Sequence, residues 1–138
     1  MEKMIKINTT VRAPMEKVWD YWNKPEHITH WAFASDDWEA PEAENDLREG
    51  GKFKTVMAAK DGSAKFDMTG TYTQVKEHSL IEFTMDDGRK VKVEFNQTPS
   101  GVDINESFEP ENENPEEKQR EGWQSILNNF KKYVESSN

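Results

Sequence analysis

Residues 102–136 read VDINESFEPENENPEEKQREGWQSILNNFKKYVES and join a strand pattern to a long helix pattern. At the start of this stretch, Val102, Ile104, Glu106 and Phe108 alternate with polar residues, which predicts a strand with one apolar face. The alternation places the Glu106 carboxylate on that face, where an unpaired buried charge is costly. We therefore expect a bonding partner for Glu106, a bulge that turns it outward, or a role as a pocket anchor with a raised pKa.

The rest of the stretch predicts a loop followed by a helix. Residues 109–113 are acidic, and we expect them to form a solvated loop. Asn114 is a suitable N-cap and Pro115 a suitable first helical residue, so the helix should run from there to about Ser136. About 20 residues at 1.5 Å each span roughly 30 Å, enough to cross a small sheet. The apolar stripe of this helix contains Trp123, Ile126, Leu127, Phe130 and Val134.

Working back from this stretch, alternating segments separated by turn residues predict an antiparallel meander. The segments are Phe53–Met57, Phe66–Thr73, Ile81–Met85 and Val91–Phe95. The turn signals are Lys60–Ser63, Asp87–Gly88 and Ser100–Gly101.

The N-terminal third predicts one strand and two short helices. Ile5–Arg12 alternates as a half-buried strand, and Pro14–Asn23 has apolar residues at helical spacing. Pro25–Trp31 has room for one or two more helical turns. Residues 34–51 mix turn formers with isolated apolar residues, which indicates an irregular strand and loop.

Together these elements predict a single α+β domain over residues 1–138. A curved antiparallel sheet of about six to seven strands should be covered by the long C-terminal helix, with the two short helices after the first strand. Where a curved sheet and a helix diverge, a gap is left in which a small molecule can bind.

Composition narrows the function classes. The 138 residues carry 18 Lys and Arg against 27 Asp and Glu, a net charge of −9, which disfavours nucleic-acid binding. The sequence lacks a long apolar span and cysteine, so we expect no membrane insertion, no thiolate chemistry and a cytoplasmic location. His27 and His30 lack the partners of a metal site, and we expect no metal or other cofactor.

Several blocks of residues, taken together, resemble a known group of proteins. They are Val11–Pro14 with Val18 and Trp19, Pro25–Ile28 with Trp31, Glu44–Arg48 with Gly50–Phe53, Gly70–Tyr72, and Glu121–Trp123 with Leu127. This set resembles the START-like (SRPBCC) superfamily, and within it the family of the activator of heat-shock-protein-90 ATPase homologue. The resemblance implies a helix-grip fold with a deep cavity between sheet and helix, and a hydrophobic ligand in that cavity. It brings no catalytic motif onto this chain.

Inward-facing aromatic and Met residues predict an adaptable apolar lining, with Glu106 or Tyr72 as the directional hydrogen-bonding group. The candidate ligand-binding residues are Trp31, Trp38, Phe66, Met68, Tyr72, Met85, Phe95, Glu106, Trp123 and Leu127. Gly122 lies within the predicted helix, which indicates either close packing of helix on sheet or room for a ligand.

Three functions are compatible with this pattern. The first is a non-catalytic module that binds a small hydrophobic or flat aromatic molecule, as a monomer or weak homodimer. The second is a cyclase- or dehydratase-like enzyme in which Glu106 is the acid or base. The third is a protein-interaction domain that regulates a chaperone, and we rank the chaperone behind a small-molecule partner.

Overall fold

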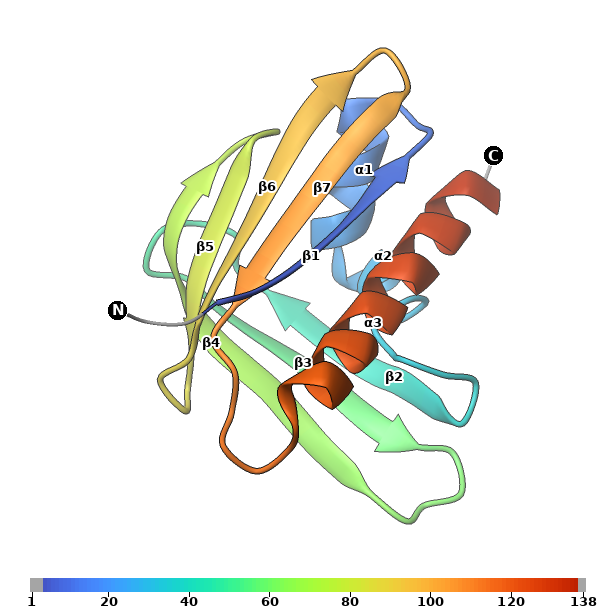
Figure 1. The fold of residues 1–138 in the computed structure, drawn as a ribbon, viewed down its shortest axis with the longest axis vertical. Helices are drawn as coiled ribbons and strands as arrows, with labels where there is room; N and C mark the ends of the chain where they lie inside the picture. The colour runs from blue at the N-terminus through green and yellow to red at the C-terminus, as the bar shows by residue number, and fades with distance from the viewer. Residues whose placement is uncertain (1–3, 137–138) are drawn as a thin grey trace.

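Seven antiparallel strands form one curled sheet in the computed structural model, which describes residues 4–136 (Figure 1). The strands are β1 (Ile5–Val11), β2 (Trp38–Asn45), β3 (Lys52–Ala59), β4 (Lys65–Lys76), β5 (Leu80–Met85), β6 (Lys90–Thr98) and β7 (Gly101–Phe108). The helices are α1 (Met15–Asn23), α2 (Pro25–Ile28) and α3 (Glu116–Ser136). This arrangement confirms the predicted α+β class, with two short helices after the first strand and a long C-terminal helix.

The strand order in the sheet is β1-β7-β6-β5-β4-β3-β2. Strands β2 to β7 are a meander of antiparallel neighbours, as the alternating segments and turn residues predict. Strand β1 joins this meander beside β7, with Ile7 opposite Glu106 and Val11 opposite Val102. The helices α1 and α2 carry the chain from the β1 edge to the β2 edge, so the first two strands are the two edges of the sheet (Figure 1).

Helix α3 lies along β1 and donates hydrogen bonds to its backbone. Its side chains reach three alternate carbonyl oxygens of that edge strand. The bonds are Arg120 Nη1 to Lys6 O (3.1 Å), Gln124 Nε2 to Asn8 O (3.1 Å) and Lys131 Nζ to Thr10 O (2.7 Å). Alternate carbonyls of an edge strand face away from its neighbour and need another partner. The polar side of α3 thus covers an edge of the sheet while its apolar stripe faces the core.

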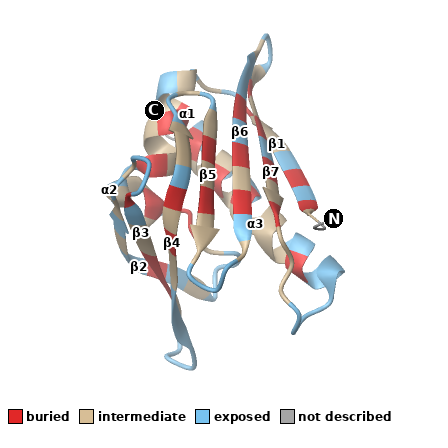
Figure 2. Cartoon of the chain, turned by 90° about the vertical axis from the view of Figure 1, so that its left-hand side faces the viewer, coloured by how far each residue is buried: buried red, intermediate tan, exposed pale blue. Residues whose placement is uncertain are grey.

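The packed core lies between β1, β6, β7, α1 and the C-terminal half of α3. The side chains with no exposed surface are Val11, Val18, Val93, Val102, Ile104, Phe108, Phe130 and Val134. Buried and outward residues alternate along β6 and β7, as Figure 2 shows by colour. Within the described residues, none of the helices has both the length and the apolar character needed to cross a bilayer.

The segment expected to form an irregular strand and loop contains β2, whose register with β3 shifts between Glu39 and Glu42. Pro41 lies at this shift, and an edge strand tolerates proline because one side of its backbone has no strand partner. Helix α2 has one of the one or two expected turns: it ends at Ile28, and the chain passes through non-helical turns up to Trp31.

Candidate functional site

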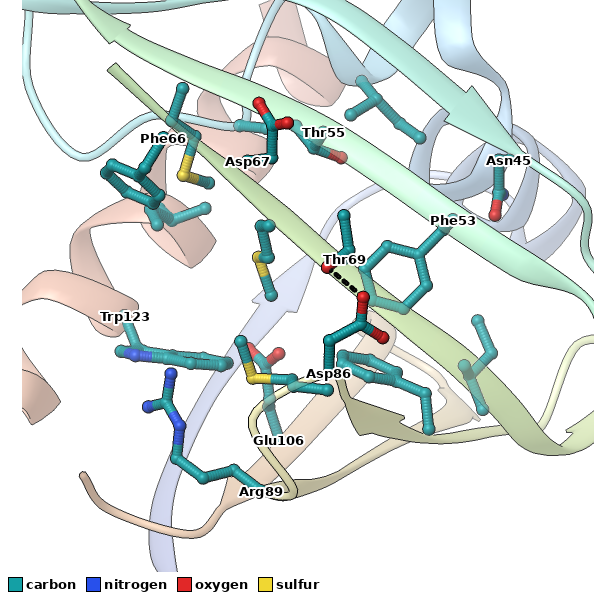
Figure 3. A pocket seen from close by; sticks show the side chains of 18 of the residues that line it. Asn45, Phe53, Thr55, Phe66, Asp67, Thr69, Asp86, Arg89, Glu106 and Trp123 are labelled. Atoms are coloured by element: carbon teal, nitrogen blue, oxygen red, sulfur yellow. Dashed lines mark hydrogen bonds between the residues drawn. The ribbon is translucent and has the colours of Figure 1, made fainter. Parts of the chain in front are cut away.

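A cavity of about 630 Å³ lies between the N-terminal half of α3 and the inner face of β3, β4 and β5 (Figure 3). This volume lies within the range of small-molecule sites, roughly 300–1,000 Å³. Helix α3 follows the β1 edge, and the cavity separates its N-terminal half from β3, β4 and β5. Trp123 lines the cavity and stacks on the fully buried Phe108 with ring centroids 4.0 Å apart. This stack forms the boundary between the packed core and the cavity.

Most of the candidate ligand-binding residues meet at this cavity. Those that line it are Trp31, Phe66, Met68, Tyr72, Met85, Glu106, Trp123 and Leu127. They come from the segment after α2, from β4, β5 and β7, and from α3. Phe66 is 51% exposed, and the other lining residues of this set are buried or half-buried.

Trp38 and Phe95, the other two candidate ligand-binding residues, do not line this cavity. Phe95 lies farther along β6, where its ring packs edge-on against Trp19 and Trp22 of α1 at 5.2 and 5.6 Å. Trp38 begins β2 and packs edge-on against Phe66 at 5.8 Å. Both side chains pack against other aromatic residues of the fold. The sequence shows that they face inward, but an inward direction on a strand does not determine which end of the sheet a residue reaches.

The sequence prediction missed Phe53 and Phe83, which line the cavity and pack edge to face at 4.8 Å. The Phe53 ring lies over Gly70: a Cβ at Gly70 would be 2.7 and 2.8 Å from two of its ring carbons. An aromatic ring that covers a glycine on the neighbouring strand is a known device of sheet packing. Both Phe residues lie on the apolar faces of alternating segments, so the sequence indicated that they point inward. It gave no indication that Phe53 covers Gly70 on the neighbouring strand.

Tyr72 is not a free hydrogen-bonding group. Its hydroxyl donates to Asn45 Oδ1, and the Asn45 amide donates in turn to the backbone oxygen of Asn23 at 2.6 Å. Burial raises the pKa of Tyr72, which stays neutral as a phenol. Of the two directional groups expected from the sequence, Tyr72 already has a protein partner.

Glu106 is a buried carboxyl group in the cavity that lacks such a partner. Its side chain is 7% exposed, and its cross-strand neighbours are Ile7 and Val93. Among residues 4–136, no hydrogen bond or ion pair reaches its carboxyl group. Burial raises the pKa of Glu106 to about 8. β7 is in regular register with both neighbours at this position, so neither a bulge nor a protein partner compensates Glu106.

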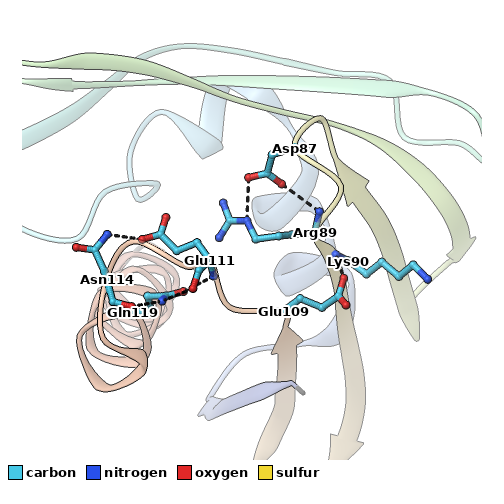
Figure 4. A network of polar contacts seen from close by, with 7 residues as sticks. All are labelled: Asp87, Arg89, Lys90, Glu109, Glu111, Asn114 and Gln119. Carbon is cyan, nitrogen blue, oxygen red and sulfur yellow. Dashed lines mark hydrogen bonds and ion pairs between the residues drawn. The ribbon is translucent and has the colours of Figure 1, made fainter. Parts of the chain in front are cut away.

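A polar network surrounds the ends of the strands near the cavity (Figure 4). Arg89 Nε donates to Asp87 Oδ2 at 2.9 Å in the β5–β6 turn. Gln119 of α3 holds the acidic loop, because its amide oxygen accepts from Glu111 N at 2.9 Å and its amide nitrogen donates to Asn114 O at 2.8 Å. The loop over residues 109–113, which we expected to be solvated, is therefore bonded to the first turns of α3. Its residue Glu111 lines the cavity.

The two histidines considered for a metal are engaged with α3. His27 Nδ1 lies 2.7 Å from the hydroxyl of Tyr133, and the His30 ring stacks on Tyr133 with centroids 5.4 Å apart. In the part of the chain that the structure describes, no three His, Cys, Asp or Glu side chains are grouped as metal ligands would be.

Comparison with known proteins identifies the family. Residues 12–135 match the family model described as Activator of Hsp90 ATPase homolog 1-like protein. The chain belongs to this family. The resemblance noted in the sequence is confirmed, and the curled sheet around a long helix is the START-like fold of this family.

Solved structures of similar proteins support the same assignment. The AHSA1-like protein from Aeromonas hydrophila is 45% identical, with a TM-score of 0.92, and the match covers 97% of this chain and 93% of that one. Chr148 from Cytophaga hutchinsonii is 52% identical, with a TM-score of 0.80, covering 98% of this chain and 92% of that one. The protein CV1439 from Chromobacterium violaceum is 23% identical and shares the fold, with a TM-score of 0.86 and coverage of 96% and 98%. Comparison with curated proteins gave no match.

Proposed function

We propose that this member of the Activator of Hsp90 ATPase homolog 1-like family binds a small hydrophobic or flat aromatic molecule in the cavity between α3 and the sheet. The observation that carries the proposal is the combination of a 630 Å³ cavity, an aromatic and Met lining, and one buried carboxyl group without a partner. Binding sites for small molecules have this composition: mostly apolar walls with a few placed polar groups.

Different side chains would contribute different parts of the binding energy. The rings of Phe53, Phe83 and Trp123 offer faces and edges for a flat ligand, since aromatic pairs favour stacked and edge-to-face contacts. Met68 and Met85 can adjust to irregular shapes because the Met side chain is unbranched and polarisable. A ligand group that bonds to Glu106 would fix the orientation of the bound molecule.

Titration with flat aromatic probes tests the proposal. We expect naphthylmethanol and related compounds to raise the melting temperature and to shift the methyl resonances of Met68 and Met85, because these methyl groups line the cavity. The methyl resonance of Met15 on α1 should not move, since Met15 lies outside the cavity.

A matched pair of variants makes this test specific. Met68→Trp replaces the flexible Met side chain with a bulky indole ring that fills part of the cavity, and it should weaken probe binding by about tenfold or more. Met15→Trp introduces the same side chain at a half-buried position outside the cavity and should leave binding unchanged. Equal binding by both variants, or shifts spread over the surface instead of the cavity, would contradict the proposal.

The two other functions remain hypotheses with less support. An enzyme would use Glu106 as acid or base, but the two residues opposite it in the sheet, Ile7 and Val93, carry no titratable group. Regulation of a chaperone would follow the name of the family, which refers to activation of the Hsp90 ATPase. The expected cytoplasmic location and the monomeric or weakly dimeric state also stay predictions.

A further inference from the structure

We propose that the ligand is a hydrophobic cation, an amine or similar base attached to an apolar or flat aromatic body, whose charged group pairs with the Glu106 carboxylate. The inference rests on the proposed function, because it names the chemical class of the molecule that occupies the same cavity. Two independent observations carry it: the unpartnered carboxyl group in the cavity and the sign of the charges around it.

The first observation is the position of Glu106. The side chain is 93% buried, lines the cavity, and has aliphatic residues opposite it on both neighbouring strands, Ile7 and Val93. In Figure 3, Glu106 points into the cavity from β7 and Trp123 from α3. Buried polar groups in folded proteins almost always have a bonding partner. Because the described residues supply none, we infer that a ligand group supplies it.

The second observation is the charge of the other residues that line the cavity. The charged residues of the lining besides Glu106 are Glu44, Asp67, Asp86, Asp87, Arg89 and Glu111. Glu44 and Asp67 alternate along β2 and β4 with the inward residues Asn45, Phe66 and Met68, so their carboxylates lie on the outer face of the sheet. The charged groups at the cavity are therefore Asp86, Asp87, Arg89 and Glu111. Arg89 is the one cation among these lining residues, and its guanidinium group is already paired with Asp87 at 2.9 Å. Its side chain is 20% exposed and is held in the β5–β6 turn.

Lys54, Glu44 and Asp67 neutralise one another on the outer face of the sheet. Lys54 Nζ lies 3.8 Å from Asp67 Oδ2, and Lys54 is paired in register with Glu44, so this group adds little to the charge at the cavity. Asp86 and Glu111 receive only hydrogen bonds from uncharged groups, the Thr69 hydroxyl at 2.6 Å and the side chain of Asn114. The cavity therefore stays negative overall, in a chain whose net charge is −9.

This distribution separates the three classes of hydrophobic ligand. An anionic ligand such as a fatty acid would meet repulsion from the surrounding carboxylates and has no free cation to pair with. A neutral ligand could accept a hydrogen bond from protonated Glu106, but it would gain nothing from the other carboxylates at the cavity. A cation is attracted both by the Glu106 carboxylate and by those other carboxylates, and the aromatic lining adds cation–π attraction.

The protonation state of Glu106 makes proton release on binding a second measurable consequence of the proposal, besides the preference for a cation. With a pKa raised to about 8 by burial, the carboxyl group holds its proton at neutral pH. Pairing with a cation requires the carboxylate form, so binding should release close to one proton. The titratable groups that share the cavity are Asp86, Asp87, Arg89, Glu111 and Tyr72, whose hydroxyl is bonded to Asn45.

Three naphthalene derivatives of one shape test the proposal: naphthylmethylamine, naphthylmethanol and naphthoate. Affinity for the 138-residue chain at about pH 7 is measured by calorimetry in two buffers of different ionisation enthalpy. We expect the amine to bind about tenfold or more tightly than the alcohol, the carboxylate to bind weakest, and only the amine to release a proton. Higher salt should weaken amine binding and leave the alcohol unchanged.

The variant Glu106→Gln keeps the shape of the side chain and removes its charge. It should lower the affinity for the amine about tenfold or more, remove the proton release, and leave binding of the alcohol nearly unchanged. Glu94→Gln is the matched control, because Glu94 is exposed on β6, does not line the cavity, and loses the same charge.

The outcomes distinguish this inference from the proposed function. If the alcohol binds as tightly as the amine, or if Glu106→Gln and Glu94→Gln bind the amine equally, the ligand class is wrong while the cavity remains a binding site. If the alcohol binds best and is lost as the pH rises past about 8, Glu106 serves as a proton donor to a neutral ligand and the inference is overturned. If none of the three binds, the proposed function is wrong and the inference falls with it.

Discussion

Glu106 couples the folding free energy of this protein to pH. Burial raises its pKa in the folded protein from 4.5 to about 8, so the folded state holds the proton more tightly than the unfolded chain does. The stability that this group contributes is complete below the unfolded pKa and is lost as the pH rises through the folded pKa. The expected slope between these values is about 1.4 kcal/mol per pH unit.

Denaturant unfolding of Glu106→Gln tests this coupling. The variant cannot ionise at position 106, so its stability should rise relative to the wild type from about pH 5 to about pH 8 and then stay at a constant difference. Glu94→Gln, on the exposed face of β6, should follow the pH dependence of the wild type. Parallel curves for the wild type and Glu106→Gln would show that the carboxyl group is not held in a water-poor site.

At the scale of the elements, β3 and β4 are joined by a contact that only glycine permits. A Cβ at Gly70 would lie 2.7 Å from a ring carbon of Phe53 and 2.8 Å from the backbone oxygen of Thr84. Gly70→Ala should therefore destabilise the protein by about 1–3 kcal/mol, because either the ring or the strand must shift. Thermal or denaturant unfolding measures this change.

Gly122 of α3 provides the opposite case. A Cβ built there meets nothing within 4 Å, so close packing on the sheet does not explain this glycine. Gly122→Ala should stabilise the protein by about 0.5–1 kcal/mol through helix propensity alone. If Gly122→Ala destabilised the protein as much as Gly70→Ala, the space beside α3 would be filled in solution.

The edge of the sheet determines where α3 lies. Three polar side chains of this helix bond to carbonyl groups of β1, and its apolar stripe packs on the core beside that strand. The helix therefore follows one edge instead of crossing the middle of the sheet. This placement leaves a space between α3 and the strands β3, β4 and β5 at the level of Trp123, which is the cavity.

For the whole molecule, we expect one cooperative unfolding transition. All seven strands belong to one continuous sheet, and α3 is bonded to its edge, so no group of elements has a core of its own. Far-UV circular dichroism reports the sheet and helices, while near-UV circular dichroism reports the packing of the aromatic rings. The two transitions should coincide, and a separate earlier loss of the near-UV signal would contradict the single-domain prediction.

The order of the elements and the inward direction of Glu106 were determined by the sequence itself. Alternation in Val102–Phe108 and the helical stripe of α3 are local patterns, and each states which face of an element is apolar. The same patterns identified eight of the residues that line the cavity, including Met68, Met85 and Trp123.

Only the tertiary structure decided which inward residues share the cavity and whether Glu106 has a partner. Phe95 and Phe83 both point inward, but Phe95 lies under α1 and Phe83 lines the cavity. The pairing of Phe53 with Gly70 and the bonds from α3 to β1 join residues far apart in the chain. The physical reason is that periodicity reports the face of a single element, whereas the curvature of the sheet and the position of the helix along it result from contacts between elements.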